Sequence, residues 1–141
     1  MASGSVMAVV DEIAVAVDRD ADIVTARQTG RELAAKAGFT GSDLAVIATA
    51  ISEVARNIIL YAERCEIVLS LVQRSGSKGI TVIARDNGPG IPDIDLAMQD
   101  GYSTGKSLGL GLPGAKRLMD EFAIASEPGK GTTITMMKWT S

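Results

Sequence analysis

Two β-rich runs that lie close together in the chain limit the possible architectures more than any other feature. They are CEIVLSLV, from Cys65 to Val72, and GITVIAR, from Gly79 to Arg85, and only QRSGSK separates them. Gly76 and Ser77 in this linker suit a hairpin turn, so the two strands should pair antiparallel. A hairpin at this point argues against a doubly wound parallel sheet.

The remaining segments alternate between apolar residues at helical spacing and short extended runs. The expected elements are, in order, a strand at Ile13–Val17, a helix capped by Asp22 and ended by Gly38, a longer helix from Ser42 to about Ala62, the hairpin, a short helix from about Asp93 to Gln99, a helix up to Phe122, and strands at Ala123–Ser126 and Thr132–Trp139. This order predicts an α+β two-layer sandwich, with helices on one face of a mixed, mostly antiparallel sheet. The length of 141 residues, without a repeat or a long linker, predicts one domain.

Composition excludes several classes of function. The net charge is −3, there is no basic run, and aromatic residues make up 4%, so nothing indicates nucleic-acid binding. The first ten residues lack a basic signal-peptide region, and no apolar run approaches the ~20 residues of a membrane span. We therefore expect a cytoplasmic protein that binds neither nucleic acid nor membrane.

The chain contains no histidine and one cysteine. The absence of histidine removes histidine acid-base catalysis, Ser-His-Asp triads, most zinc sites and any phosphohistidine intermediate. The single cysteine, Cys65, excludes an intrachain disulfide, fits a reducing compartment, and is expected to be a buried thiol rather than a reactive one.

The segment QDGYSTGKSLGLGLPGAKRL contains two apparent nucleotide-binding motifs, and both fail. GYSTGKS is one residue short of a P-loop, and a helical rather than a strand pattern precedes it. GLGLPG matches GxGxxG, but it neither follows a strand nor precedes an acidic residue at the required distance. Phosphate binding survives as a hypothesis, because glycines expose backbone amides before a helix; the alternative is a surface loop leading to that helix.

Two further segments carry polar groups that could form a site. In ISEVARNIILYA, Glu53 and Asn57 are four residues apart and share one helix face, where they could hold Mg²⁺, water or an attacking hydroxyl. A local ion pair between Glu53 and Arg56 is the simpler alternative. In DNGPGIPD, Asp86 ends a strand, and Gly88 and Gly90 leave room for a flat ring such as adenine; a plain turn is the alternative.

Taken in order, ExxxN on a helix, DxGxG after a strand, GLGL and GKGTTI resemble the four motifs of the GHKL (Bergerat-fold) ATPase superfamily. Within it, the chain looks like the switch serine/threonine-protein kinases of the bacterial stressosome, the RsbT type, which are close to the anti-sigma-factor serine kinases. The resemblance extends from about Ile13 to Trp139. It implies a Bergerat ATP-binding fold, with residues 1–12 as an N-terminal extension and residues 13–141 as a single kinase domain.

The resemblance also implies roles for individual residues. Glu53 would be the catalytic base, Asn57 the Mg²⁺ ligand, Asp86 the reader of the adenine amino group, with Gly88 and Gly90 beside it, and Thr132 a support at the adenine end. ATP phosphates would contact the glycine-rich segment and the lid from Gly101 to Ser107, namely Ser103, Thr104, Gly105, Lys106, Gly109, Leu110 and Gly111. Lys106 departs from the family pattern, and it can either reach the terminal phosphate or remain a solvated residue.

The family's substrates are serine or threonine hydroxyls of STAS-domain proteins, and its stressosome members also bind and activate a partner phosphatase. An Mg-ATP-dependent kinase with those partners is therefore the main hypothesis. The alternatives are an anti-sigma factor that sequesters a sigma factor and a detached histidine-kinase catalytic domain. The last would need dimerisation helices and a phosphoacceptor histidine from elsewhere.

Overall fold

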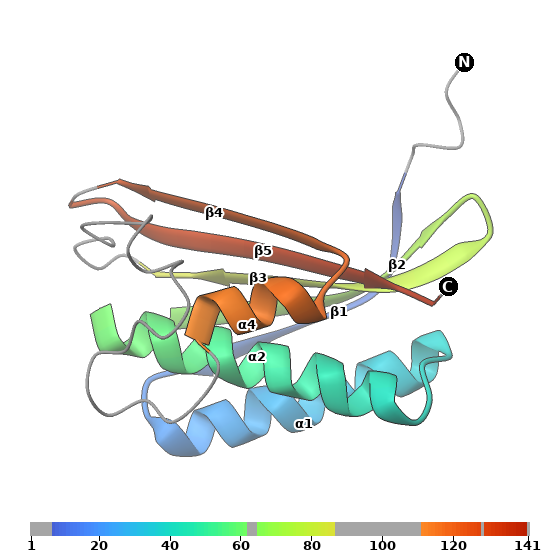
Figure 1. Cartoon of the computed structure of the whole chain (residues 1–141), viewed down its shortest axis with the longest axis horizontal. Helices are drawn as coiled ribbons and strands as arrows, with labels where there is room; N and C mark the ends of the chain where they lie inside the picture. The colour runs from blue at the N-terminus through green and yellow to red at the C-terminus, as the bar shows by residue number, and fades with distance from the viewer. Residues whose placement is uncertain (1–6, 62–64, 87–110, 128, 141) are drawn as a thin grey trace.

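The computed structural model describes residues 7–61, 65–86, 111–127 and 129–140, and Figure 1 shows their arrangement. The elements are β1 (Ala8–Val17), α1 (Asp20–Ala37), α2 (Ser42–Tyr61), β2 (Cys65–Arg74), β3 (Ser77–Arg85), α4 (Gly111–Leu118), β4 (Glu121–Glu127) and β5 (Gly131–Trp139). None of these helices is long and apolar enough to cross a membrane.

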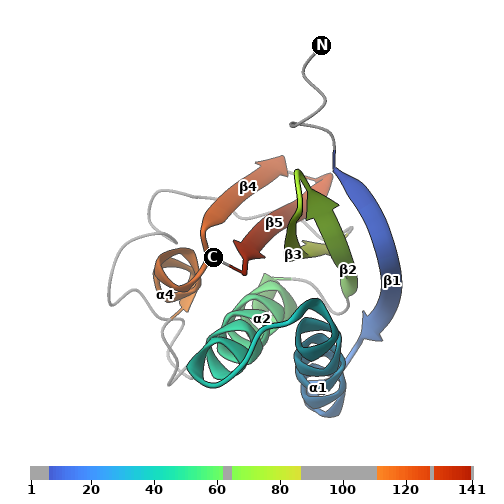
Figure 2. The same cartoon turned by 90° about the vertical axis from the view of Figure 1, so that its right-hand side faces the viewer.

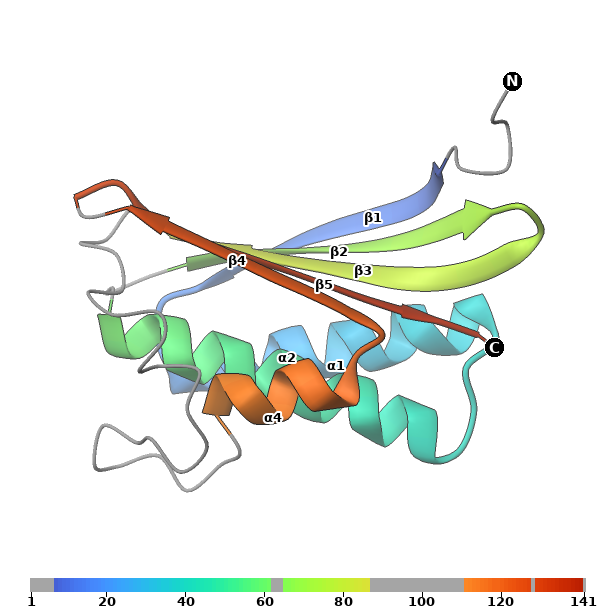
Figure 3. The same cartoon turned by 45° about the horizontal axis from the view of Figure 1, so that its top comes forward.

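The strands form one five-stranded sheet in the order β1-β2-β3-β5-β4. Every neighbouring pair is antiparallel. Figures 2 and 3 show the helices together on one face of this twisted sheet. The prediction of an α+β two-layer sandwich is confirmed. All neighbouring pairs of the described strands are antiparallel, whereas the sequence predicted a mixed, mostly antiparallel sheet.

The central hairpin has a tighter turn than the sequence indicated. Arg74 lies opposite Ser77, so the turn consists of Ser75 and Gly76 alone. Their φ angles of 51° and 83° both lie in the left-handed region that a two-residue type I′ turn requires. The short turn lets β2 continue past the predicted end at Val72, and β3 begins before the predicted start at Gly79.

The two long helices approach each other closely over the sheet. Gly30 in the middle of α1 is buried, and a Cβ atom at this position would collide with Cδ1 of Ile51 on α2. Leu33, Ile51 and Leu69 are almost completely buried in the core that the helices and the sheet share. Glycine, which weakens a helix in isolation, suits this position because a larger residue would force the end of the Ile51 side chain to move.

Other predicted boundaries were also wrong. The first strand starts at Ala8 rather than Ile13, because Ala8 and Val9 pair with the longer β2. The first helix begins at Asp20; Asp22 does not precede it but lies in its first turn, where its carboxylate accepts hydrogen bonds from the backbone N–H groups of Asp18 at 2.9 Å and Arg19 at 3.3 Å.

The helix predicted to reach Phe122 ends at Leu118, and Phe122 lies in β4 opposite Met136. Contacts with β5 explain the earlier end. The N–H of Asp120 donates to the carbonyl of Met137 at 2.9 Å, and the Lys138 ammonium donates to the carbonyl of Leu118 at 3.3 Å. These bonds redirect the chain into the sheet where local propensity favours further helix.

Candidate functional site

The described site residues come from elements that meet at one end of the sandwich. In Figures 1 and 3, this end contains the C-terminal half of α2, the end of β3, the start of α4, the end of β4 and the start of β5. α2 packs against α4, β3 and β5. The topology thus collects segments that are far apart in the sequence.

Glu53 is a buried carboxylate that joins two elements. Only 6% of the residue is exposed. Its Oε1 accepts a hydrogen bond from the backbone N–H of Gly111 at 2.9 Å, and its Oε2 accepts one from the Arg56 guanidinium at 3.2 Å. The local ion pair with Arg56 therefore exists, but it accounts for only one of the two oxygens. The other contacts the first residue of α4, where helix N–H groups have no partners within the helix.

Asn57 follows one helical turn after Glu53 and carries an unsatisfied oxygen. Its Oδ1 is buried and accepts no hydrogen bond from the part of the chain that the structure describes. Buried amide oxygens normally have a partner, so this atom is available to a ligand. Magnesium usually takes one or two oxygens from a protein and the rest from phosphates and water. A single amide oxygen at this position fits such an ion.

Asp86 and Thr132 are brought together by neighbouring strands. Both are buried, with exposed fractions of 8% and 2%. The N–H of Asp86 donates to the carbonyl of Thr132 at 3.0 Å, just beyond the last pair of the β3–β5 ladder. The Thr132 hydroxyl lies 2.9 Å from that of Ser126, which is its opposite residue on β4. The pairing holds the Asp86 backbone and the threonine side chain in fixed positions.

Ser126 is a site neighbour that sequence reasoning missed. Its hydroxyl also lies 3.4 Å from the carbonyl of Gly131, and the hydroxyl pair with Thr132 orients the threonine. The signal that would have found it is the β4–β5 register, which places Ser126 opposite Thr132. The predicted strands end at Ser126 and begin at Thr132, but no pairing between these two strands was predicted.

Cys65 is buried at the start of β2, as predicted, with 5% of the residue exposed. Burial, followed by the negative charges of Asp86 and Asp18, raises the pKa of the Cys65 thiol from 9.0 to about 12. The thiolate is the reactive form of cysteine, so this side chain is inert at neutral pH. It belongs to the packing beneath Asp86 rather than to the chemistry.

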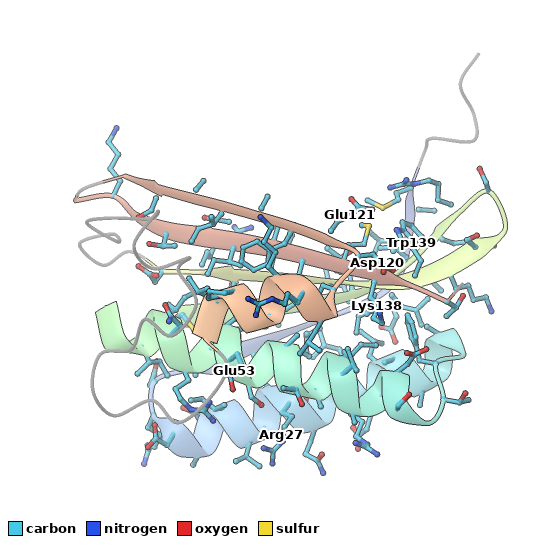
Figure 4. The ribbon with its side chains drawn as sticks, viewed as in Figure 1. Arg27, Glu53, Asp120, Glu121, Lys138 and Trp139 are labelled. Atoms are coloured by element: carbon cyan, nitrogen blue, oxygen red, sulfur yellow. The ribbon has the colours of Figure 1, made fainter. Side chains whose placement is uncertain are left out.

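Side-chain contacts connect the C-terminal end of α4 to β5, just as Glu53 connects the first residue of α4 to α2. Lys138 contacts both the carbonyl of Leu118 and the carboxylate of Asp120, at 3.3 and 3.8 Å. The Asp120 carboxylate also accepts a bond from the Trp139 backbone N–H at 2.8 Å, and the Trp139 indole donates to Glu121 at 3.0 Å. Figure 4 shows these four side chains grouped at the end of α4 away from Glu53.

The other predicted site residues lie outside the described residues. They are Gly88, Gly90, Ser103, Thr104, Gly105, Lys106, Gly109 and Leu110, together with the lid from Gly101 to Ser107 and the short helix predicted from Asp93 to Gln99. The structure thus joins Glu53 to Gly111 and Asp86 to Thr132, and it places Asn57 one turn beyond Glu53. Among the side chains that it describes, no group of three or more Cys, Asp or Glu residues could hold a metal ion.

Comparisons with known proteins identify the family of this chain. Residues 16–138 match the histidine kinase-like ATPase domain family. The serine/threonine-protein kinase RsbT of Bacillus subtilis is 53% identical over 129 residues, which cover 92% of this chain and 97% of that protein. The anti-sigma F factor of Thermoanaerobacter sp. (strain X514) is 35% identical over 119 residues, covering 81% of this chain and 82% of that protein.

Solved structures show the same fold. Part of a structure of the RsbU and RsbW domains of a Mycobacterium tuberculosis protein superposes with a TM-score of 0.59 at 25% identity, over 91% of this chain and 32% of that longer chain. The SiaB–SiaC complex of Pseudomonas aeruginosa gives a TM-score of 0.56 at 12% identity. The chain belongs to the histidine kinase-like ATPase family and, within it, to the RsbT-type serine/threonine-protein kinases.

Proposed function

We propose that this kinase transfers the γ-phosphoryl group of Mg-ATP to a serine or threonine hydroxyl of a STAS-domain protein of a stressosome. Once released from that substrate, it binds and activates a partner phosphatase in a partner-switching pathway. The observation that carries the proposed chemistry is the contact between the Glu53 carboxylate and the N–H of Gly111, at 2.9 Å. It joins the residue proposed as base to Gly111, which is both the last of the proposed phosphate-binding glycines and the first residue of α4.

The contacts of Glu53 suit the proposed role of general base. Each carboxylate oxygen accepts one hydrogen bond from the described residues, which leaves a second lone pair on each. In the proposed step, the substrate hydroxyl gives its proton to Glu53 while its oxygen forms a bond to the γ-phosphorus. The bond from that phosphorus to the bridging oxygen breaks, and ADP leaves with the electron pair. Such transfer depends mostly on positioning and charge neutralisation.

The remaining described residues would bind the nucleotide. Asn57 would hold Mg²⁺ through its buried Oδ1, and the bound ion would neutralise phosphate charge. Asp86 would accept a hydrogen bond from the adenine amino group, with Thr132 beside it in the position that Ser126 helps to fix. The phosphate contacts assigned to the glycine-rich segment and its lid stay predictions.

A transfer assay tests the proposed chemistry. Wild-type protein, γ-labelled ATP and a purified STAS-domain protein should give label on serine or threonine. Asn57→Ala should lose most of the transfer and most of the magnesium dependence of ATP binding. Gln28→Ala removes an amide that is exposed on α1 and should match wild type. Tight ATP binding without transfer to any STAS-domain protein would refute the proposed substrate class.

A second function is favoured by the similarity to anti-sigma F factors. In that case the chain would hold a sigma factor and use its kinase activity to control release. A pulldown from native lysate, with and without ATP, separates the two proposals. Capture of a phosphatase after ATP addition supports partner switching with an activator role, whereas stable capture of a sigma subunit supports the anti-sigma role.

A further inference from the structure

Arg56 contacts the proposed base directly. Its guanidinium Nη1 lies 3.2 Å from Oε2 of Glu53, three residues earlier on α2. The two partners differ in exposure: 40% of the Arg56 side chain is exposed and only 8% of the Glu53 side chain. The carboxylate is therefore buried, and the guanidinium is partly exposed to solvent.

The carboxylate needs two donors to have a defined direction. Rotation of a glutamate carboxylate about its last bond is broad, so one hydrogen bond does not set the plane of the two oxygens. Here Gly111 holds Oε1 and Arg56 holds Oε2. Because one donor belongs to α4 and the other to α2, the pair fixes both the orientation of the carboxylate and its position between the helices.

We propose that Arg56 is a positioning residue for the Glu53 carboxylate. The inference rests on the proposed function, because it concerns the residue assigned there as base. Arg56 acts through Glu53 and needs no contact with substrate or nucleotide. Its planar charged group suits this task, because a guanidinium presents several donors in a fixed arrangement. If Arg56 were only a surface ion-pair partner, its removal would change stability slightly and leave the reaction rate unchanged.

Three variants at this position separate positioning from packing. Arg56→Ala should lower kcat about tenfold to a hundredfold, the order of loss expected from misplacing a reacting group by about 1 Å. The Kd for ATP should stay within about twofold, since the change leaves Asn57 and Asp86 in place. Arg56→Met keeps an apolar stem without the charge and should behave like alanine. Arg56→Lys should restore part of the rate, because an ammonium can donate to Oε2 without fixing its plane.

Two controls make the result specific to Glu53. Arg31→Ala removes an exposed arginine from the neighbouring helix α1 and should leave kcat and the Kd for ATP at wild-type values. In a Glu53→Gln background, Arg56→Ala should cause no further loss of kcat, because a positioning residue has no effect once its target is inactive. Additive losses in the double variant would show that Arg56 acts by another route.

The outcomes distinguish this inference from the proposed function. Wild-type transfer together with an unchanged kcat in Arg56→Ala would overturn the inference and leave the proposed function intact. A lowered kcat together with an equally weakened Kd for ATP would also overturn it, since the residue would then serve nucleotide binding. Failure of the wild-type protein to transfer phosphate would refute the proposed function and the inference with it.

Discussion

Replacing Glu53 with glutamine should separate the chemical role of this residue from its structural one. Glutamine keeps an oxygen that can accept the N–H of Gly111, which lies 2.9 Å from Oε1. It loses the charge, which reduces that hydrogen bond by about 1 kcal/mol. Loss of the ion pair with Arg56, whose side chain is 40% exposed, adds a few tenths of a kcal/mol at about the level of surface pairs.

The avoided cost of burying a charge works in the opposite direction and stabilises the glutamine variant. Glu53 is 6% exposed, and a neutral side chain at this depth avoids the cost of burying a charge. We therefore expect the free energy of unfolding of Glu53→Gln to stay within about 1 kcal/mol of wild type. Phosphoryl transfer should fall by about 10² to 10⁴, the usual contribution of a general base.

Glu53→Ala should differ from Glu53→Gln in stability alone. Alanine removes the acceptor and deprives the Gly111 N–H of its bond at the start of α4. Loss of a side-chain cap at a helix N-terminus costs about 0.5 to 2 kcal/mol. Both variants should therefore lose transfer, while only the alanine variant should unfold at distinctly lower urea concentration.

Rapid-quench measurement of transfer at saturating ATP, combined with urea unfolding, tests both expectations. Glu66→Gln, which neutralises an exposed glutamate on β2, is the control for the general effect of charge. Transfer by Glu53→Gln within about fivefold of wild type would refute the assignment of Glu53 as base, since a base contributes at least about 10². Equal destabilisation of the two variants would refute the capping role.

Two further predictions concern Asp86 and Cys65. Asp86→Asn should weaken ATP binding about tenfold to a hundredfold through loss of a charge-assisted hydrogen bond, while the backbone hydrogen bond to Thr132 preserves the fold. Calorimetry, with Asp43→Asn as the control, measures the Kd for ATP. An unchanged Kd would contradict the prediction. Between pH 9 and about 12 the Cys65 thiol should ionise only in the unfolded chain, because its folded pKa is raised from 9.0 to about 12. Above pH 9, the free energy of unfolding should therefore fall by about 1.4 kcal/mol per pH unit relative to that of Cys65→Ala, which lacks the thiol. If urea unfolding gives the same pH dependence for both proteins, the prediction is wrong.

The sequence predicted the type of each described element correctly, but it misplaced several ends. Alternating and helical patterns identified β2, β3 and α2, since these signals depend on residues only a few positions apart. The end of α4 depends instead on Lys138 and Met137, which lie on a strand further along the chain. Phe122 continued a helical pattern locally, and its pairing with Met136 decided the outcome.

Spacing along the chain predicted which residues could form a site, whereas it could not predict how those residues assemble. Glu53 and Asn57 share a helix face because four residues make about one turn, and Asp86 had to follow a strand because of the β-rich run before it. The three-residue spacing on α2 indicated a pair between Glu53 and Arg56, but no local pattern could show that Glu53 caps α4 through Gly111 or that Ser126 orients Thr132. These contacts join residues from different elements, and only the packing of α2 against α4 and the register of β4 on β5 bring the partners within hydrogen-bonding distance.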